Sequence, residues 1–177
     1  MIDVVLGVLH EQEAEGIVRP IRSDLVPVTA ASRDVAESAG QAMTDRLEQI
    51  GSIPLGGAVI TPAGGLNADF VIHAVVSAPD DPETPASVQK ALTNTLRRAA
   101  DLALESLAMP PLGTGIGRLD MEESALAMLA MLFFHLDEDQ PPRDVKIVTE
   151  SEYELHVFER LVAEMTSQRR AEVPNAE

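Results

Sequence analysis

The sequence predicts an α/β fold with a mostly parallel or mixed sheet. Short apolar runs suited to buried strands alternate with segments of roughly 15 to 20 residues that carry apolar residues at helical spacing. The chain has 177 residues, of which 45% are hydrophobic, a combination typical of one globular domain with a substantial core. In α/β folds, ligands bind beyond the carboxyl ends of the strands, so the loops at those ends are the first candidates for a site.

The order of the elements follows from where the apolar spacing changes. Six apolar runs predict strands, at about 2–9, 16–21, 58–61, 70–76, 107–112 and 145–149. Four segments with apolar residues three and four positions apart predict helices, at about 32–49, 87–107, 120–136 and 157–165. Gly51 is the expected stop of the first helix. The helix over 120–136 is apolar nearly all round, which predicts deep packing.

Composition restricts the classes of partner. The net charge of −16 argues against sequence-independent binding of nucleic acid, which needs a basic face. The longest apolar run, 125–134, is far shorter than the roughly 20 residues of a membrane span. The N-terminal segment has no basic region typical of a secretory signal, so we expect a cytoplasmic protein without a membrane partner.

The remaining composition predicts neither a metal site nor a cofactor. The chain has no cysteine, and its four histidines lack metal-ligand spacing. We expect a single domain over residues 1–166. Residues 167–177 are polar and predict a frayed tail.

The most informative segment is a glycine-rich loop between the strand at 107–112 and the following helix. Its five residues are Gly113, Thr114, Gly115, Ile116 and Gly117. Glycines let backbone N–H groups approach an anion, and the next helix N-terminus adds its positive dipole end. Asp120 and Glu123 have the spacing of a capping box at that N-terminus. The loop lacks the spacing of a Walker A or dinucleotide motif, so the spacing alone leaves a phosphate cradle and a plain turn equally open.

Two segments resemble the macrodomain family, the ADP-ribose-binding α/β module. Residues 63–75, with Val-Ile-His-Ala at 71–74, are similar to the family's turn and following strand, and 111–117 resembles its second phosphate loop. The resemblance extends over about residues 1–165. It implies a three-layer α/β/α sandwich with a central mixed sheet. It also implies that residues 113–117 face the diphosphate and distal ribose of a nucleotide ligand, mainly through backbone amides.

The chain departs from the family pattern in the loop after the second strand and at the position that contacts the adenine base. Val8 stands where the family has an aspartate that accepts a hydrogen bond from adenine, so Val8 and Leu9 would lie on the adenosine side. Arg22 stands where hydrolytic members have a catalytically important asparagine, and residues 23–32 contain no glycine. Arg22 is a candidate anion contact, with an ion pair to a nearby acid as the alternative.

The residues do not argue for catalysis, and we assign no catalytic residue. Asp24 is the one evident general base, but an aspartate beside arginines is more often an ion-pair partner. His73 is expected to be a core histidine with a hydrogen-bonded ring. The sequence therefore predicts binding of ADP-ribose or a related nucleotide diphosphate without turnover. Two alternatives stay open, namely an ADP-ribosyl or O-acetyl-ADP-ribose hydrolase, and an assembly module for a protein partner whose pocket is filled by Leu25, Val26 and Val28.

Overall fold

A computed structural model of the chain, which describes residues 1–115 and 118–172, contains one six-stranded sheet. The strands are β1 (Ile2–Leu6), β2 (Gly16–Arg22), β3 (Ala58–Pro62), β4 (Phe70–Ser77), β5 (Ser106–Met109) and β6 (Asp144–Thr149). Their order across the sheet is β1-β6-β5-β2-β4-β3. All neighbours are parallel except β3, which is antiparallel to β4. The predicted mixed sheet is confirmed.

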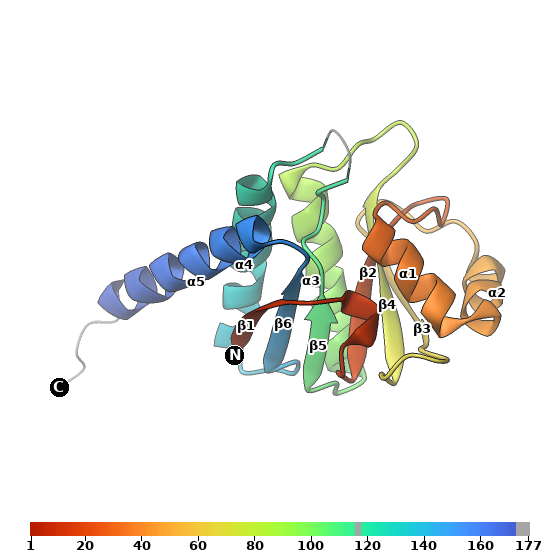
Figure 1. Ribbon diagram of the computed structural model, residues 1–177, viewed down its shortest axis with the longest axis horizontal. Coiled ribbons are helices and arrows are strands. Elements are labelled where there is room, and N and C mark those ends of the chain that lie inside the picture. Colours follow the sequence, from red (N-terminus) through yellow and green to blue (C-terminus); the bar gives the residue numbers. More distant parts are fainter. Residues whose placement is uncertain (116–117, 173–177) are drawn as a thin grey trace.

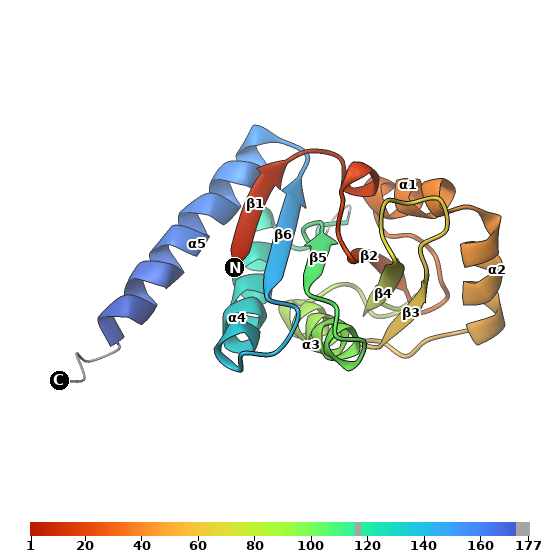
Figure 2. The same ribbon diagram turned by 90° about the horizontal axis from the view of Figure 1, so that it is seen from below.

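Helices cover both faces of the sheet, as a mostly parallel sheet requires. They are α1 (Ala30–Ala39), α2 (Gln41–Ile50), α3 (Pro85–Asp101), α4 (Met121–Asp137) and α5 (Glu152–Glu172), with a short 3-10 helix η1 at Leu9–Glu11. Figure 1 and Figure 2 show α1 on one face and α3 with α4 on the other, while α5 lies at the β1 edge and projects beyond it. The predicted three-layer α/β/α sandwich is confirmed.

Alternation along the strands divides the core between the two faces. Val18 and Ile72 pack with α3 and α4 in the larger apolar cluster, whereas their neighbours Ile17 and Val71 pack with α1 and α2. All four side chains are fully buried. The central strands therefore have no solvent-facing side, which explains why they are continuous apolar runs in the sequence.

The helix predicted over 32–49 is wrong in one respect, because the structure divides it into α1 and α2 at Gly40. The apolar stripe continues across this point, since Val35 and Ala39 of α1 and Met43 of α2 are all buried in the same cluster. Gly40 has φ +97°, a conformation outside the helical region that glycine adopts without steric cost. Figure 2 shows that α2 is turned away from the axis of α1.

The other boundaries differ where a local motif ends the element. The predicted helix over 87–107 ends at Asp101, because Ala103 adopts φ +53° and the N–H of Leu104 bonds the Ala99 carbonyl, as in a Schellman motif. The predicted strand over 2–9 ends at Leu6 and is followed by η1. The last helix, predicted over 157–165, begins at Glu152.

Helix α5 continues through residues 167–172, which form the first part of the segment expected to be a polar tail. Residues 173–177 lie outside the described residues.

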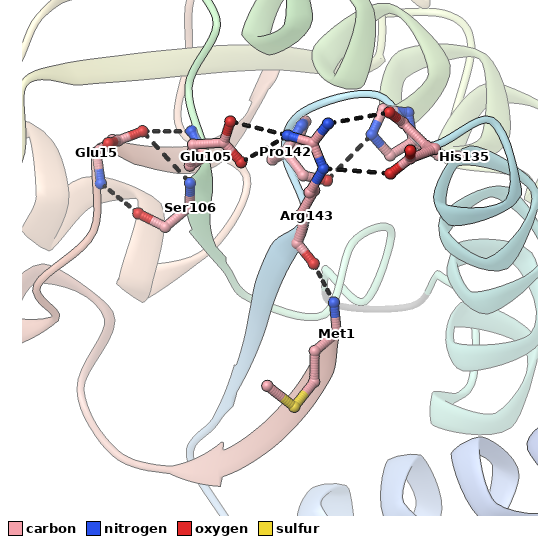
Figure 3. A network of polar contacts seen from close by, with 8 residues as sticks. Met1, Glu15, Glu105, Ser106, His135, Pro142 and Arg143 are labelled. Atoms are coloured by element: carbon pink, nitrogen blue, oxygen red, sulfur yellow. Dashed lines mark hydrogen bonds and ion pairs between the residues drawn. The ribbon is translucent and has the colours of Figure 1, made fainter.

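Side-chain hydrogen bonds fix the start of α4 and the amino edge of the sheet. The predicted capping box of α4 is confirmed, since Asp120 Oδ1 accepts from the Glu123 N–H at 2.8 Å and Glu123 Oε2 accepts from the Asp120 N–H at 3.1 Å. At the amino edge of the sheet, the Glu15 carboxylate accepts hydrogen bonds from the backbone N–H groups of Glu105 and Ser106 (Figure 3).

In the described part of the chain, no helix has both the length and the apolar character needed to cross a membrane.

Candidate functional site

The sheet has a topological switch point between β2 and β5. These strands pair only at Gly16 with Leu107 and at Ile17 with Ala108, although β2 continues to Arg22. The chain leaves β2 toward α1 on one face, and it leaves β5 toward α4 on the other. Such a divergence opens a crevice at the carboxyl edge of a parallel sheet.

A crevice of about 610 Å³ lies at this point, a volume within the usual range for small-molecule sites. Its lining consists of Val26, Pro27, Val28, Thr29, Ala30, Arg33, Thr114, Gly115, Glu150 and Glu154. A smaller cavity of about 50 Å³ adjoins it and shares Thr29, Thr114, Glu150 and Glu154. Leu9 and Val148 line the smaller cavity, which adds apolar side chains beside these shared polar ones.

The first turn of α1 forms one wall of the crevice. Thr29 is its N-cap, and the Thr29 hydroxyl accepts the Ser32 N–H at 3.1 Å. The earlier N–H groups, those of Ala30 and Ala31, belong to the same helix start, where the helix dipole is positive. Arg33 adds a side-chain cation to this wall. The wall therefore presents positive charge to a crevice that the carboxylates of Glu150 and Glu154 also line.

The glycine-rich loop forms the opposite wall through Thr114 and Gly115. Gly113 has φ +81° and packs away from the crevice, because a Cβ there would lie 2.6 Å from Val88 Cγ2. A Cβ on Gly115 would lie 3.2 Å from the Val28 carbonyl oxygen, so the two walls approach closely at this residue. Ile116 and Gly117, the other predicted phosphate-loop residues, lie outside the described residues.

An ion pair between Glu83 and Arg118, which was not predicted from the sequence, lies beside this loop. Glu83 Oε2 lies 2.7 Å from Arg118 Nε, and the Glu83 side chain is only 3% exposed. A Cβ on Gly115 would lie 3.1 Å from Glu83 Oε1, so the carboxylate lies directly beside the loop. Arg118 thus balances a buried negative charge next to a proposed anion site.

The structure places Arg22 in the ion pair that the sequence analysis named as the alternative to anion contact. Arg22 Nε and Nη2 each donate to one oxygen of Asp24 at 2.7 Å, and neither residue lines the crevice. The hydrogen bonds from Arg22 lower the pKa of Asp24, which makes this carboxylate a weaker base. The structure thus brings Leu9, Thr114 and Gly115 together around the two cavities and leaves Arg22 outside.

Of the two residues expected on the adenosine side, one lines a cavity and the other does not. Leu9 is buried and lines the smaller cavity. Val8 is 40% exposed and is absent from the described lining of either cavity. The valine side chain supplies no hydrogen-bond acceptor at this end of the crevice.

A buried polar network lies beneath α1. Arg19 Nε donates to Ser32 Oγ at 3.2 Å, and Arg19 Nη1 contacts His73 Nδ1 at 3.4 Å. Because arginine has donors only, His73 Nδ1 is the acceptor, and its protonated Nε2 donates to Thr61 Oγ1 at 2.8 Å. Burial, with a smaller contribution from the Arg19 charge, lowers the pKa of His73 to about 3. The expectation of a core histidine with a hydrogen-bonded ring is confirmed.

Other parts of the described chain are less suited to an anionic ligand. A second cavity of about 610 Å³ lies at the amino edge, where Glu13, Glu15 and Asp69 outnumber the single cation Lys146. Carboxylates also outnumber the cation in the crevice, where Glu150 and Glu154 face Arg33, so the feature that distinguishes the crevice is the N-terminus of α1 in its wall. Residues 1–115 and 118–172 contain no group of three or more histidine and carboxylate side chains placed to hold a metal ion.

Comparisons with known proteins agree with the geometry. The family model described as Macro domain matches residues 23–128. A protein of Aeropyrum pernix is 30% identical over 177 residues, covering 98% of this chain and 92% of its own. An O-acetyl-ADP-ribose deacetylase of Enterobacter cloacae is 28% identical, covering 92% of this chain and 94% of its own.

A solved structure has the same fold. The Trypanosoma brucei macrodomain in complex with ADP-ribose superimposes with a TM-score of 0.81 at 18% identity, covering 91% of this chain and 68% of that one.

Proposed function

Because the chain belongs to the macrodomain family, we propose that it binds ADP-ribose or a related nucleotide-diphosphate ligand in the crevice between β2 and β5, without turning it over. The observation that carries this proposal is the pairing of two backbone walls across the crevice. One wall is the first turn of α1, and the other is Thr114 with Gly115. The relative solved with ADP-ribose supports the choice of ligand class.

The residues that line the two cavities set the proposed orientation of the ligand. The diphosphate lies between the N–H groups at the start of α1 and the wall of Thr114 and Gly115, with Arg33 as a nearby cation. The base lies toward the smaller cavity, which Leu9 and Val148 line. Val8 stands where the family resemblance gives an adenine-contacting aspartate, and a valine has no hydrogen-bond acceptor, so we expect weak discrimination between adenine and other bases.

Binding without turnover follows from the first loop. Arg22 replaces the asparagine that the family resemblance gives to hydrolytic members, and it is engaged with Asp24. Asp24, the candidate base of the hydrolase alternative, lies outside the lining of the crevice. The deacetylase relative keeps that alternative testable, because incubation with O-acetyl-ADP-ribose distinguishes release of acetate from plain binding.

The assembly alternative required the first loop to fill the pocket. Leu25 instead packs with Ile21 and Leu47 under α2, and Val28 packs against the large core cluster. Val26 is largely exposed at the rim. A crevice of about 610 Å³ remains beside them, which supports ligand binding over assembly.

Calorimetric titration with ADP-ribose tests the proposed function. We expect micromolar binding by the wild type and loss of binding by Gly115→Glu, which puts a side chain and a negative charge between the walls. Gln49→Glu, on the exposed surface of α2, adds the same charge and serves as the control. No heat at millimolar ADP-ribose from the folded wild type would overturn the proposal.

A further inference from the structure

Arg19 is a buried arginine that has no acidic partner among residues 1–115 and 118–172. Its side chain is 2% exposed, and its two protein contacts, Ser32 Oγ and His73 Nδ1, are both neutral. In the described part of the chain, no carboxylate lies within the 4.0 Å of an ion pair to this guanidinium. Arg143 has the usual surroundings of an arginine. Glu105 accepts hydrogen bonds from it at 2.9 and 3.1 Å (Figure 3). The Asp139 carboxylate lies 3.3 Å from its Nε.

The partners of Arg19 solvate its charge without neutralising it. Ser32 Oγ donates its own proton to the Pro20 carbonyl at 2.6 Å, which leaves its lone pairs for Arg19. His73 is neutral because its pKa is about 3. Burial lowers the pKa of Arg19 to about 10, so the guanidinium stays protonated at neutral pH. A buried cation of this kind destabilises the folded protein unless a counter-ion is present.

The position of Arg19 indicates where the counter-ion belongs. Arg19 lies on β2 two residues beyond Ile17, the last residue that pairs with β5, and therefore at the point where the two strands part. It contacts Ser32, the third residue of α1, whose first turn lines the crevice. Its Nη1 is directed to His73 on β4, and Arg19 is not among the described lining residues of the crevice, so the guanidinium lies beneath the first turn of α1 and can act on the crevice only across that turn.

We propose that Arg19 is a buried electrostatic anchor for the ligand, with the diphosphate in the crevice as the counter-ion that the protein interior lacks. The inference rests on the proposed function, because it assigns a phosphate-bearing ligand to the crevice. Arg19 acts across the first turn of α1, so it is a positioning residue that adds its charge to the helix dipole. The chain has 29 acidic residues, so the missing partner does not reflect a shortage of carboxylates.

The test compares Arg19→Met with Arg143→Met, which changes the net charge equally at the amino edge. We expect Arg19→Met to lose at least about tenfold in affinity for ADP-ribose and to leave the affinity for adenosine, which has no phosphate, unchanged. The melting temperature of the ligand-free Arg19→Met protein should equal or exceed that of the wild type, because an uncompensated charge is removed. Arg143→Met should leave both affinities unchanged.

Two further variants cover the case in which Arg19→Met fails to fold. Arg19→Lys keeps the charge and should bind ADP-ribose more tightly than Arg19→Gln, which keeps hydrogen-bonding capacity only. Equal ADP-ribose affinity of the Lys and Gln variants, or an equal loss for ADP-ribose and adenosine, would overturn the inference. If the wild type binds neither ADP-ribose nor inorganic pyrophosphate, the proposed function is overturned as well. If the wild type binds ADP-ribose and Arg19→Gln binds it with the same affinity, only the role of Arg19 is overturned.

Discussion

Glu83 and Arg118 join two loops at the carboxyl edge of the sheet through an ion pair of 2.7 Å. Glu83 precedes α3, and Arg118 follows the glycine-rich loop. The Glu83 side chain is buried, whereas Arg118 is partly exposed. The pair therefore fixes the wall that Thr114 and Gly115 contribute to the crevice.

Removal of Arg118 should destabilise the protein through the carboxylate left behind. We expect Arg118→Met to lower the free energy of unfolding by about 1–3 kcal/mol, with solvent at the exposed Arg118 limiting the effect. Urea denaturation measures this change. The double variant Arg118→Met/Glu83→Gln should lose less than the sum of the two single losses, so additive losses would show that the pair is uncoupled. Arg160→Met, on exposed surface pairs of α5, should cost less than Arg118→Met.

His73 should make stability depend on pH. Its folded-state pKa of about 3 lies below the ordinary value of 6.5, so between these values the unfolded chain binds a proton that the folded chain excludes. This stabilising contribution is complete above pH 6.5 and falls by about 1.4 kcal/mol per pH unit as the pH decreases toward 3. Urea denaturation between pH 7 and 5 should show a shallower dependence for His73→Gln than for the wild type. Identical pH dependences would contradict the assigned burial of a neutral ring.

Gly40 and Gly113 both have positive φ but should respond differently to alanine. A Cβ on Gly40 meets nothing within 4 Å, so Gly40→Ala costs only the backbone strain of its φ +97° and ψ 175°, about 1–3 kcal/mol. A Cβ on Gly113 lies 2.6 Å from Val88 and 2.9 Å from Leu119, so Gly113→Ala should cost more and shift the loop. Thermal unfolding and ADP-ribose titration of both variants check this order. Equal effects would mean that Gly113 is not sterically confined.

A valine at position 8 should make the crevice discriminate only weakly between adenine and other bases. We expect the wild type to bind ADP-ribose and UDP-glucose with affinities within about tenfold of each other, because no carboxylate at position 8 accepts from an amino group. Val8→Asp should raise the affinity for ADP-ribose by about tenfold and leave that for UDP-glucose unchanged. Competition titrations measure both ratios, and a wild-type preference for ADP-ribose above about 100-fold would refute the role of Val8.

The sequence predicted the layers of the fold because its strands and helices differ in apolar period. It missed the division between α1 and α2, since the buried stripe of Val35, Ala39 and Met43 continues across Gly40. It overextended α3, since Ala103 ends that helix in a conformation that its side chain does not signal. Periodicity detects which side is buried, and it does not detect a single backbone angle.

The site was predicted less completely than the fold. Thr114 and Gly115 were accessible to sequence reasoning because glycine spacing is local. The Glu83–Arg118 pair was not, because its partners are brought together only by the sheet. Arg33 carried no more signal than Arg22, and only the start of α1 shows which of them reaches the crevice. The environment of Arg19, buried beside neutral partners, is visible only in the packed structure.

The most direct test of the central claim is backbone amide NMR of the 19.0 kDa protein during titration with ADP-ribose. The account predicts that the largest shifts fall on Ala30, Ala31, Thr114 and Gly115, the N–H groups of the two walls. Shifts concentrated instead around Glu13 and Lys146 at the amino edge, or no shifts at millimolar ligand, would contradict binding in the crevice.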